Sequence, residues 1–120
     1  MNRPLSNEER HLIYWMLEHS TSGARNFLPQ LEQIQVTPWK CPCGCASINL
    51  EIQGRPKPVG GIHPLADFVF GSNEDLSGIF VCEQSGILAG VEVYCLADNV
   101  PKQLPSAEAL HPFSAAAQSP

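Results

Sequence analysis

The sequence lacks the features that mark membrane-spanning, secreted and disordered chains. It contains no run of about 18 apolar residues, so we expect no membrane-spanning helix. Its first ten residues show no basic segment followed by an apolar stretch, so we expect no secretory signal peptide. Of the 120 residues 43% are hydrophobic and 16% are charged, which is typical of a globular domain. We therefore expect a cytoplasmic protein with no membrane partner.

Positive charge is missing from much of the second half of the chain. No Lys or Arg occurs between Lys57 and Lys102, whereas six Asp and Glu residues lie there, and the net charge of the chain is −5. This balance disfavours a nucleic-acid partner and favours a basic protein partner. The same charges are also typical of a solvated face that only keeps a protein in solution.

The cysteine pattern excludes the commonest thiol motifs. The chain has five cysteines, an odd number, and no C-x-x-C pair. An odd count without a signal peptide argues against a disulfide framework. The absence of C-x-x-C excludes a thioredoxin-like redox motif and the paired knuckles of many zinc sites.

The N-terminal third predicts two helices. Ser6 and Glu9 fit the S-x-x-E capping box that begins a helix, and apolar residues then recur at helical spacing up to Leu17. A second helix is predicted between Ala24 and Ile34, with Pro29 in or near its first turn, where a missing N–H is tolerated. The sequence therefore predicts a helical hairpin.

After residue 35 the apolar period changes to two, which indicates strands. Strands are predicted over 46–53, 65–70, 77–83 and 86–96, the last two forming a hairpin. In the last strand the expected core face consists of the odd-numbered apolar residues Ile87, Ala89, Val91, Val93 and Cys95. We expect an α+β fold in which the N-terminal helical hairpin packs on one face of an antiparallel sheet of about four strands. A single domain should span residues 5–113, and 114–120 should form a flexible tail.

Three cysteines alternate in the stretch WKCPCGC, and three interpretations are open. Cys41, Cys43 and Cys45 could bind zinc with His63 as a fourth ligand, since thiolate and imidazole are zinc donors. One of the thiols could instead be an activated nucleophile of a thiol-dependent enzyme. The third interpretation, which we favour at this stage, makes the cysteines small buried hydrophobes in a bulged entry to the next strand.

The acidic half suggests a surface for binding another protein. Glu83, Glu92 and Asp98 belong to the predicted sheet half, and Tyr94 is a candidate anchor between them. Small acidic α+β proteins include bacterial immunity proteins that neutralise basic toxins, an analogy of size and charge only. We expect a non-enzymatic binding module with a basic partner, and an exposed sheet edge also leaves a homodimer open.

Three motifs together resemble those of a known family. They are Cys41-Pro-Cys-Gly-Cys-Ala-Ser-Ile48, Gly90-Val-Glu-Val-Tyr94 and Leu104-Pro-Ser-Ala-Glu-Ala-Leu110. In this combination the chain resembles a family of small uncharacterised bacterial proteins. The resemblance implies a bacterial, cytoplasmic, single-domain protein without an established activity, and it assigns no catalytic residue.

Overall fold

The computed structural model describes residues 1–20, 22–52, 54, 60–72, 75–96 and 100–112. It confirms the α+β class. In chain order its elements are β1 (Arg3–Pro4), α1 (Asn7–Glu18), α2 (Ser22–Arg25), the 3₁₀ helix η1 (Leu28–Glu32), β2 (Ile34–Val36), β3 (Ile48–Ile52), β4 (Ile62–Phe70), β5 (Ser77–Gln84), β6 (Ile87–Cys95), the 3₁₀ helix η2 (Ala107–Ala109) and β7 (His111–Pro112).

The strands form one antiparallel sheet in the order β1-β2-β3-β6-β5-β4-β7. Seven strands replace the predicted four or so, because three very short strands, β1, β2 and β7, add to the sheet on either side. Each edge strand contains a proline, Pro4 or Pro112. Proline is suited to an edge because it has no N–H to offer a further strand.

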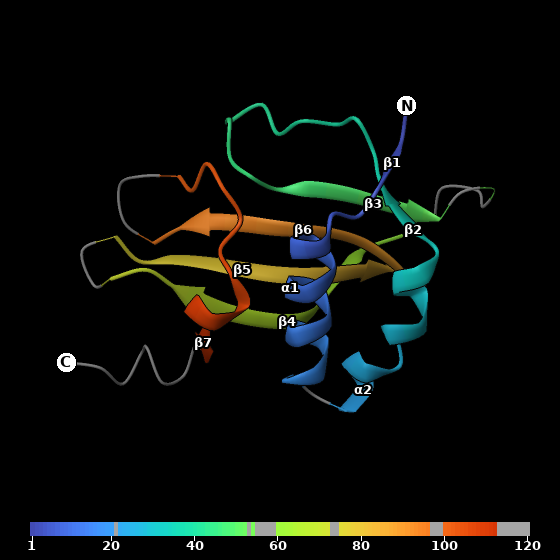
Figure 1. Cartoon of the computed structure of the whole chain (residues 1–120), viewed down its shortest axis with the longest axis horizontal. Helices are drawn as coiled ribbons and strands as arrows, with labels where there is room; N and C mark the ends of the chain where they lie inside the picture. The colour runs from blue at the N-terminus through green and yellow to red at the C-terminus, as the bar shows by residue number, and fades with distance from the viewer. Residues whose placement is uncertain (21, 53, 55–59, 73–74, 97–99, 113–120) are drawn as a thin grey trace.

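In the described part of the chain, the helices lie on one face of the sheet and none of them covers the other face (Figure 1). In Figure 1, α1 lies in front of the sheet with α2 beside its lower end, and the chain that follows residue 100 crosses the same side toward β7. A core of buried apolar side chains fills the space between these layers. We call the opposite side of the sheet the open face.

Helix α1 forms as the sequence predicts. The Ser6 hydroxyl accepts the backbone N–H of Glu9 at 3.1 Å, and the Glu9 carboxylate accepts the N–H of Ser6 at 2.8 Å. This capping box satisfies donors that the first turn of a helix leaves free. The apolar stripe of the helix is buried against the sheet and comprises Leu12, Ile13, Met16 and Leu17.

The predicted helical hairpin is not confirmed. Helix α2 is only four residues long, and the chain continues as the 3₁₀ helix η1 with Pro29 near its start. Proline cannot donate the N–H that a continuous α-helix would need at this position. Ile34, which was expected on the second helix, instead begins β2 and pairs with Ile52.

At the start of β6, the residues that face the core differ from the predicted ones. The pairing of β5 with β6 shifts between Cys82 and Glu83, so that Gly90 lies opposite Cys82 and Leu88 opposite Glu83. This bulge leaves Ala89 as an extra residue and reverses the alternation before it. Leu88 is fully buried, whereas the predicted Ile87 is half-buried.

Three further expectations concern membrane helices, the C-terminal tail and the cellular location. Within the described part of the chain, no helix has the length and apolar character needed to cross a membrane. The predicted tail at 114–120 and the candidate binding residue Asp98 lie outside the described residues. The cytoplasmic location remains a prediction.

Candidate functional site

The candidate site is the loop between β2 and β3, residues 37–47, which we call the cysteine loop. Its cysteines do not lie in the bulged strand entry that the sequence suggested, because the chain turns back on itself. The N–H of Gly44 donates to the carbonyl of Cys41 at 3.0 Å, and Gly44 has φ +85°, a conformation that glycine adopts without strain. The turn brings together side chains that alternate in sequence.

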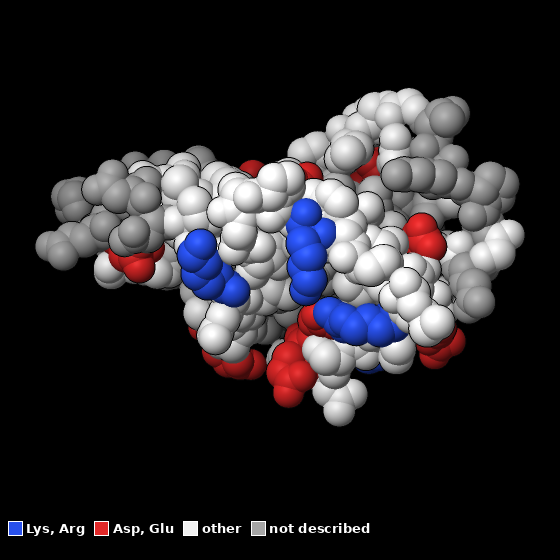
Figure 2. Space-filling view, turned by 90° about the horizontal axis from the view of Figure 1, so that it is seen from above, with Lys and Arg blue, Asp and Glu red and all other residues white. Residues whose placement is uncertain are grey.

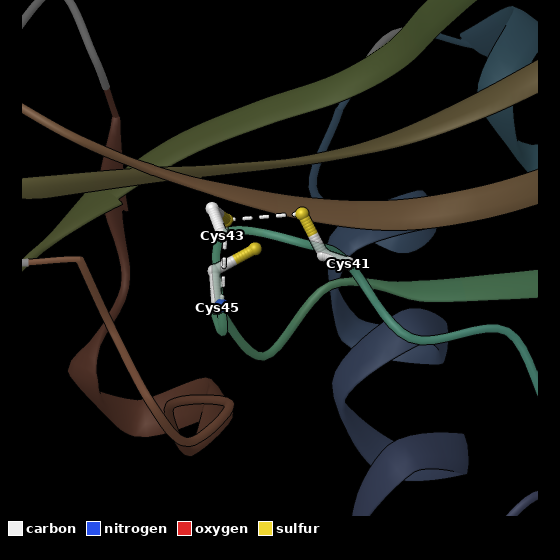
Figure 3. A group of neighbouring side chains, drawn as sticks. All are labelled: Cys41, Cys43 and Cys45. Atoms are coloured by element: carbon white, nitrogen blue, oxygen red, sulfur yellow. Dashed lines mark hydrogen bonds between the residues drawn. The ribbon is translucent and has the colours of Figure 1, made fainter.

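The three cysteine sulfurs converge. The Sγ atoms of Cys41, Cys43 and Cys45 all lie within 4.8 Å of one another, and those of Cys41 and Cys43 are 3.0 Å apart. Figure 3 shows the three side chains with their sulfurs facing a shared space. Cys43 is exposed and the other two are half-buried, so the prediction that they are buried hydrophobes is wrong. The turn holds Cys43 at the surface, with Cys41 and Cys45 partly covered beside it.

Ser47 connects this cluster to the sheet. Pairing between β3 and β6 ends at Ile48 and Val91, and the next available N–H, that of Val93, donates to the Ser47 hydroxyl at 3.0 Å. The same oxygen lies 3.2 Å from Sγ of Cys45. In its thiol form Cys45 donates to this oxygen; once Cys45 is a thiolate, the hydroxyl, which still accepts from Val93, can donate its own proton to the sulfur.

The pKa values of two neighbouring thiols, Cys45 and Cys41, are shifted in opposite directions. Burial disfavours ionisation of Cys45, but hydrogen bonds from Ser47 and from the two other thiols outweigh burial and lower the pKa of Cys45 to about 7. The hydrogen bond with Cys43 is the main cause that raises the pKa of Cys41 to about 11. The cluster therefore loses its first proton near neutral pH and holds another well above it.

The cysteine loop is anchored to the segment that follows β6. The N–H of Ala46 donates to the carbonyl of Pro101 at 3.0 Å. This contact places Lys102 against the turn: a methyl group on Gly44 would lie 3.2 Å from Nζ of Lys102. Glycine thus allows both the positive φ of the turn and the close approach of an ammonium group.

A pocket of about 630 Å³ adjoins the loop. Its lining includes Cys41, Cys45 and three cations, Arg3, Lys40 and Lys102. Figure 2 shows Lys and Arg side chains in a row across this side of the molecule. Sequence reasoning missed this gathering. Lys40 is adjacent to the triplet in sequence, but Arg3 and Lys102 reach the pocket only through the fold.

His63 is not brought to the cysteines. Its Nδ1 lies 3.0 Å from the Glu83 carboxylate, on the pair β4–β5, and among the described residues the cluster that could hold a metal consists of the three cysteines alone. The predicted fourth ligand therefore lies in a different contact.

The acidic candidates lie in separate surroundings. Glu83 is half-buried and contacts His63, whereas Glu92 lines a smaller pocket of about 220 Å³ with Trp39 and Ile62. Tyr94 lies over Gly78 and donates its hydroxyl to Asp67 at 3.2 Å. Burial, followed by the charge of Asp67, raises the pKa of Tyr94 to about 12.

Comparison with known proteins finds no match to this chain among protein-family models, curated proteins or solved structures.

Proposed function

We propose that the protein binds a soft metal ion, with zinc as the first candidate, through the thiolates of Cys41, Cys43 and Cys45. The observation that carries the proposal is the convergence of three Sγ atoms within 4.8 Å of one another. Thiolates are the ligands that zinc and other soft ions prefer.

The distances between the sulfurs suit such an ion after small side-chain rotations. A zinc–sulfur bond of about 2.3 Å in tetrahedral geometry places ligand sulfurs about 3.8 Å apart. The sulfurs of Cys41 and Cys43 are 3.0 Å apart, and every separation within the cluster is 4.8 Å or less. Binding thus requires that the sulfurs of Cys41 and Cys43 move apart by about 0.8 Å and that no other pair close by more than about 1 Å.

The electrostatic surroundings support the bound state. Three thiolates and a divalent ion carry one net negative charge, which the ammonium of Lys102 beside the turn offsets. Ser47 acts as an outer partner, because its hydroxyl can donate to the Cys45 sulfur and orient it. Three protein ligands leave one coordination position open, as in zinc sites that bind an exogenous ligand.

The proposal is tested by titrating the reduced, chelator-treated protein with Cd²⁺ and then with Zn²⁺ in competition. Thiolate-to-cadmium absorption should rise to a plateau at one ion per chain, and zinc should remove it. Changing Cys43 to Ser should lower the plateau by about a third, because one of three thiolates is lost. Cys95→Ser, which removes a thiol outside the cluster, is the matched control. An equal response from the two variants contradicts the proposal.

A second proposal keeps the interaction module suggested by the sequence and places it on the open face. The observation that favours it is the composition of β3 to β6, which contain acidic residues but no Lys or Arg. Phe80 and Tyr94 lie there as a ring pair with centroids 6.1 Å apart, and Glu92 lies opposite Phe80 in the strand pairing. Half-exposed aromatic rings beside carboxylates suit a partner with Arg and Lys side chains.

For this second proposal the assay is the association rate of a basic protein that co-purifies with the native chain. Increasing salt and the change Glu92→Lys should both slow association markedly, since electrostatic steering sets the rate. Glu108→Lys, on η2 across the molecule, should have a much smaller effect. Sedimentation of the chain alone would reveal a homodimer instead, and an association rate that is insensitive to salt would refute the charge argument.

A further inference from the structure

The pocket beside the cysteine loop has a charge opposite to that of the whole chain. The net charge of the chain is −5, yet three of the five Lys and Arg residues in the described part of the chain line this pocket. The lining contains one carboxylate, that of Glu9. An acidic protein that gathers its cations around one concave surface creates a local positive potential there.

Two of the three cations are available to a ligand. Arg3 is held by Glu9 through two hydrogen bonds of 2.8 Å each. The ion pairs among the described residues include neither Lys40 nor Lys102. Both lysines are exposed, and the Pro101 contact keeps the Lys102 segment against the loop.

The remaining surface of the pocket is apolar in part. Trp39, with 44% of its surface exposed, lines it together with Val36, Ile48 and Leu104. A bare inorganic ion would leave these side chains unused, whereas an organic body would cover them. Pockets of this size that combine an apolar wall with a few charged groups are typical of sites for small molecules.

We propose that this pocket binds a small organic oxyanion, whose carboxylate or phosphate group lies between Lys40 and Lys102 and whose apolar body packs against Trp39. The site is made by side chains that differ from the metal ligands, so it does not depend on the metal proposal. When a metal is bound, the ligand lies next to it, because Cys41 and Cys45 line the same pocket.

The proposal is tested on reduced, metal-free protein, with calorimetry and tryptophan fluorescence as readouts; Trp39 in the pocket and Trp15 on α1 both contribute to the fluorescence. Phenyl phosphate and benzoate distinguish a phosphate from a carboxylate group, and inorganic phosphate tests the need for an apolar body. We expect saturable binding of at least one organic anion, more tightly than inorganic phosphate. Lys40→Gln and Lys102→Gln should each weaken it roughly three- to tenfold, and the double variant more than either.

Arg25→Gln is the matched control, since it removes one cation that pairs with Glu18 on the helical side of the molecule. It should leave anion binding unchanged. All three positions are exposed, so unfolding transitions should be unaffected. Absence of saturable binding for both organic anions, or equal affinity in the wild type and the double lysine variant, overturns the proposal. Neither result bears on whether the cysteines bind a metal.

Discussion

The contact between Tyr94 and Gly78 leads to a quantitative prediction. A methyl group on Gly78 would overlap Cζ of the Tyr94 ring, which lies across that glycine. In Gly78→Ala the ring must move away, at a packing cost of about 1–3 kcal/mol. Its hydrogen bond to Asp67 is then lost, which costs about 1 kcal/mol more. Replacing a strand glycine by alanine recovers roughly 0.5–1 kcal/mol, so the net destabilisation should be about 2 kcal/mol.

The same substitution should behave differently once the ring is gone. In a Tyr94→Ala background, Gly78→Ala meets no ring and should stabilise the protein by about 0.5 kcal/mol. The interaction term of this double-mutant cycle is then about 2.5 kcal/mol. Urea unfolding of the four proteins measures it. An equal effect of Gly78→Ala in the two backgrounds would show that the ring does not lie over the glycine.

Three further predictions concern the cysteine loop. The alkylation rate of Cys45 by iodoacetamide should reach half its plateau near pH 7, because the thiolate is the reacting form. Mass spectrometry of the labelled peptide measures this rate, and a midpoint near pH 9 would remove the case for an activated thiol. Metal affinity should increase about tenfold or more per pH unit between pH 7 and 9, because a metal must displace the proton that Cys41 holds up to about pH 11. Competition with a chromophoric chelator measures the affinity, and an affinity that does not change with pH would mean that Cys41 is not a ligand. Ser47→Ala should raise the pKa of Cys45, which loses its hydrogen-bond partner, and should destabilise the fold by about 1–3 kcal/mol, because the N–H of Val93 loses its acceptor. Alkylation measures the first effect and urea unfolding the second, and no change in either would contradict the role of this hydroxyl.

The sequence predicts those parts of the fold whose causes are local. The capping box at Ser6 and Glu9 and the apolar stripe after it define α1 within one short segment. The hairpin of β5 and β6 likewise follows from alternation on both sides of a tight turn. Strands β1 and β7 are two residues long and exist only because β2 and β4 offer them a partner. No pattern within two residues can predict such pairing.

For the candidate site, too, the sequence predicts only the features that arise from residues close together in the chain. The three thiols are neighbours in the sequence, so their clustering could be considered from spacing alone. Their exposure could not be predicted, because it depends on the turn at Gly44 and on the Pro101–Lys102 segment that contacts the loop. Lys102 reaches the cysteine loop through one backbone hydrogen bond between Ala46 and Pro101. Long-range contacts of this kind leave no local signal.

The strand order also has a kinetic consequence for the site. Within each of the sets β2-β3 and β4-β5-β6 the paired strands follow one another in the chain, but β3 and β6 meet only after a long loop closes. The bond from Val93 to Ser47 lies at that junction and joins residues 46 positions apart. Closing a longer loop costs more chain entropy, so this junction should form late during folding and open early in native-state fluctuations. The sulfur cluster would then gain its link to β6, which runs through Ser47, only in the last stage of folding.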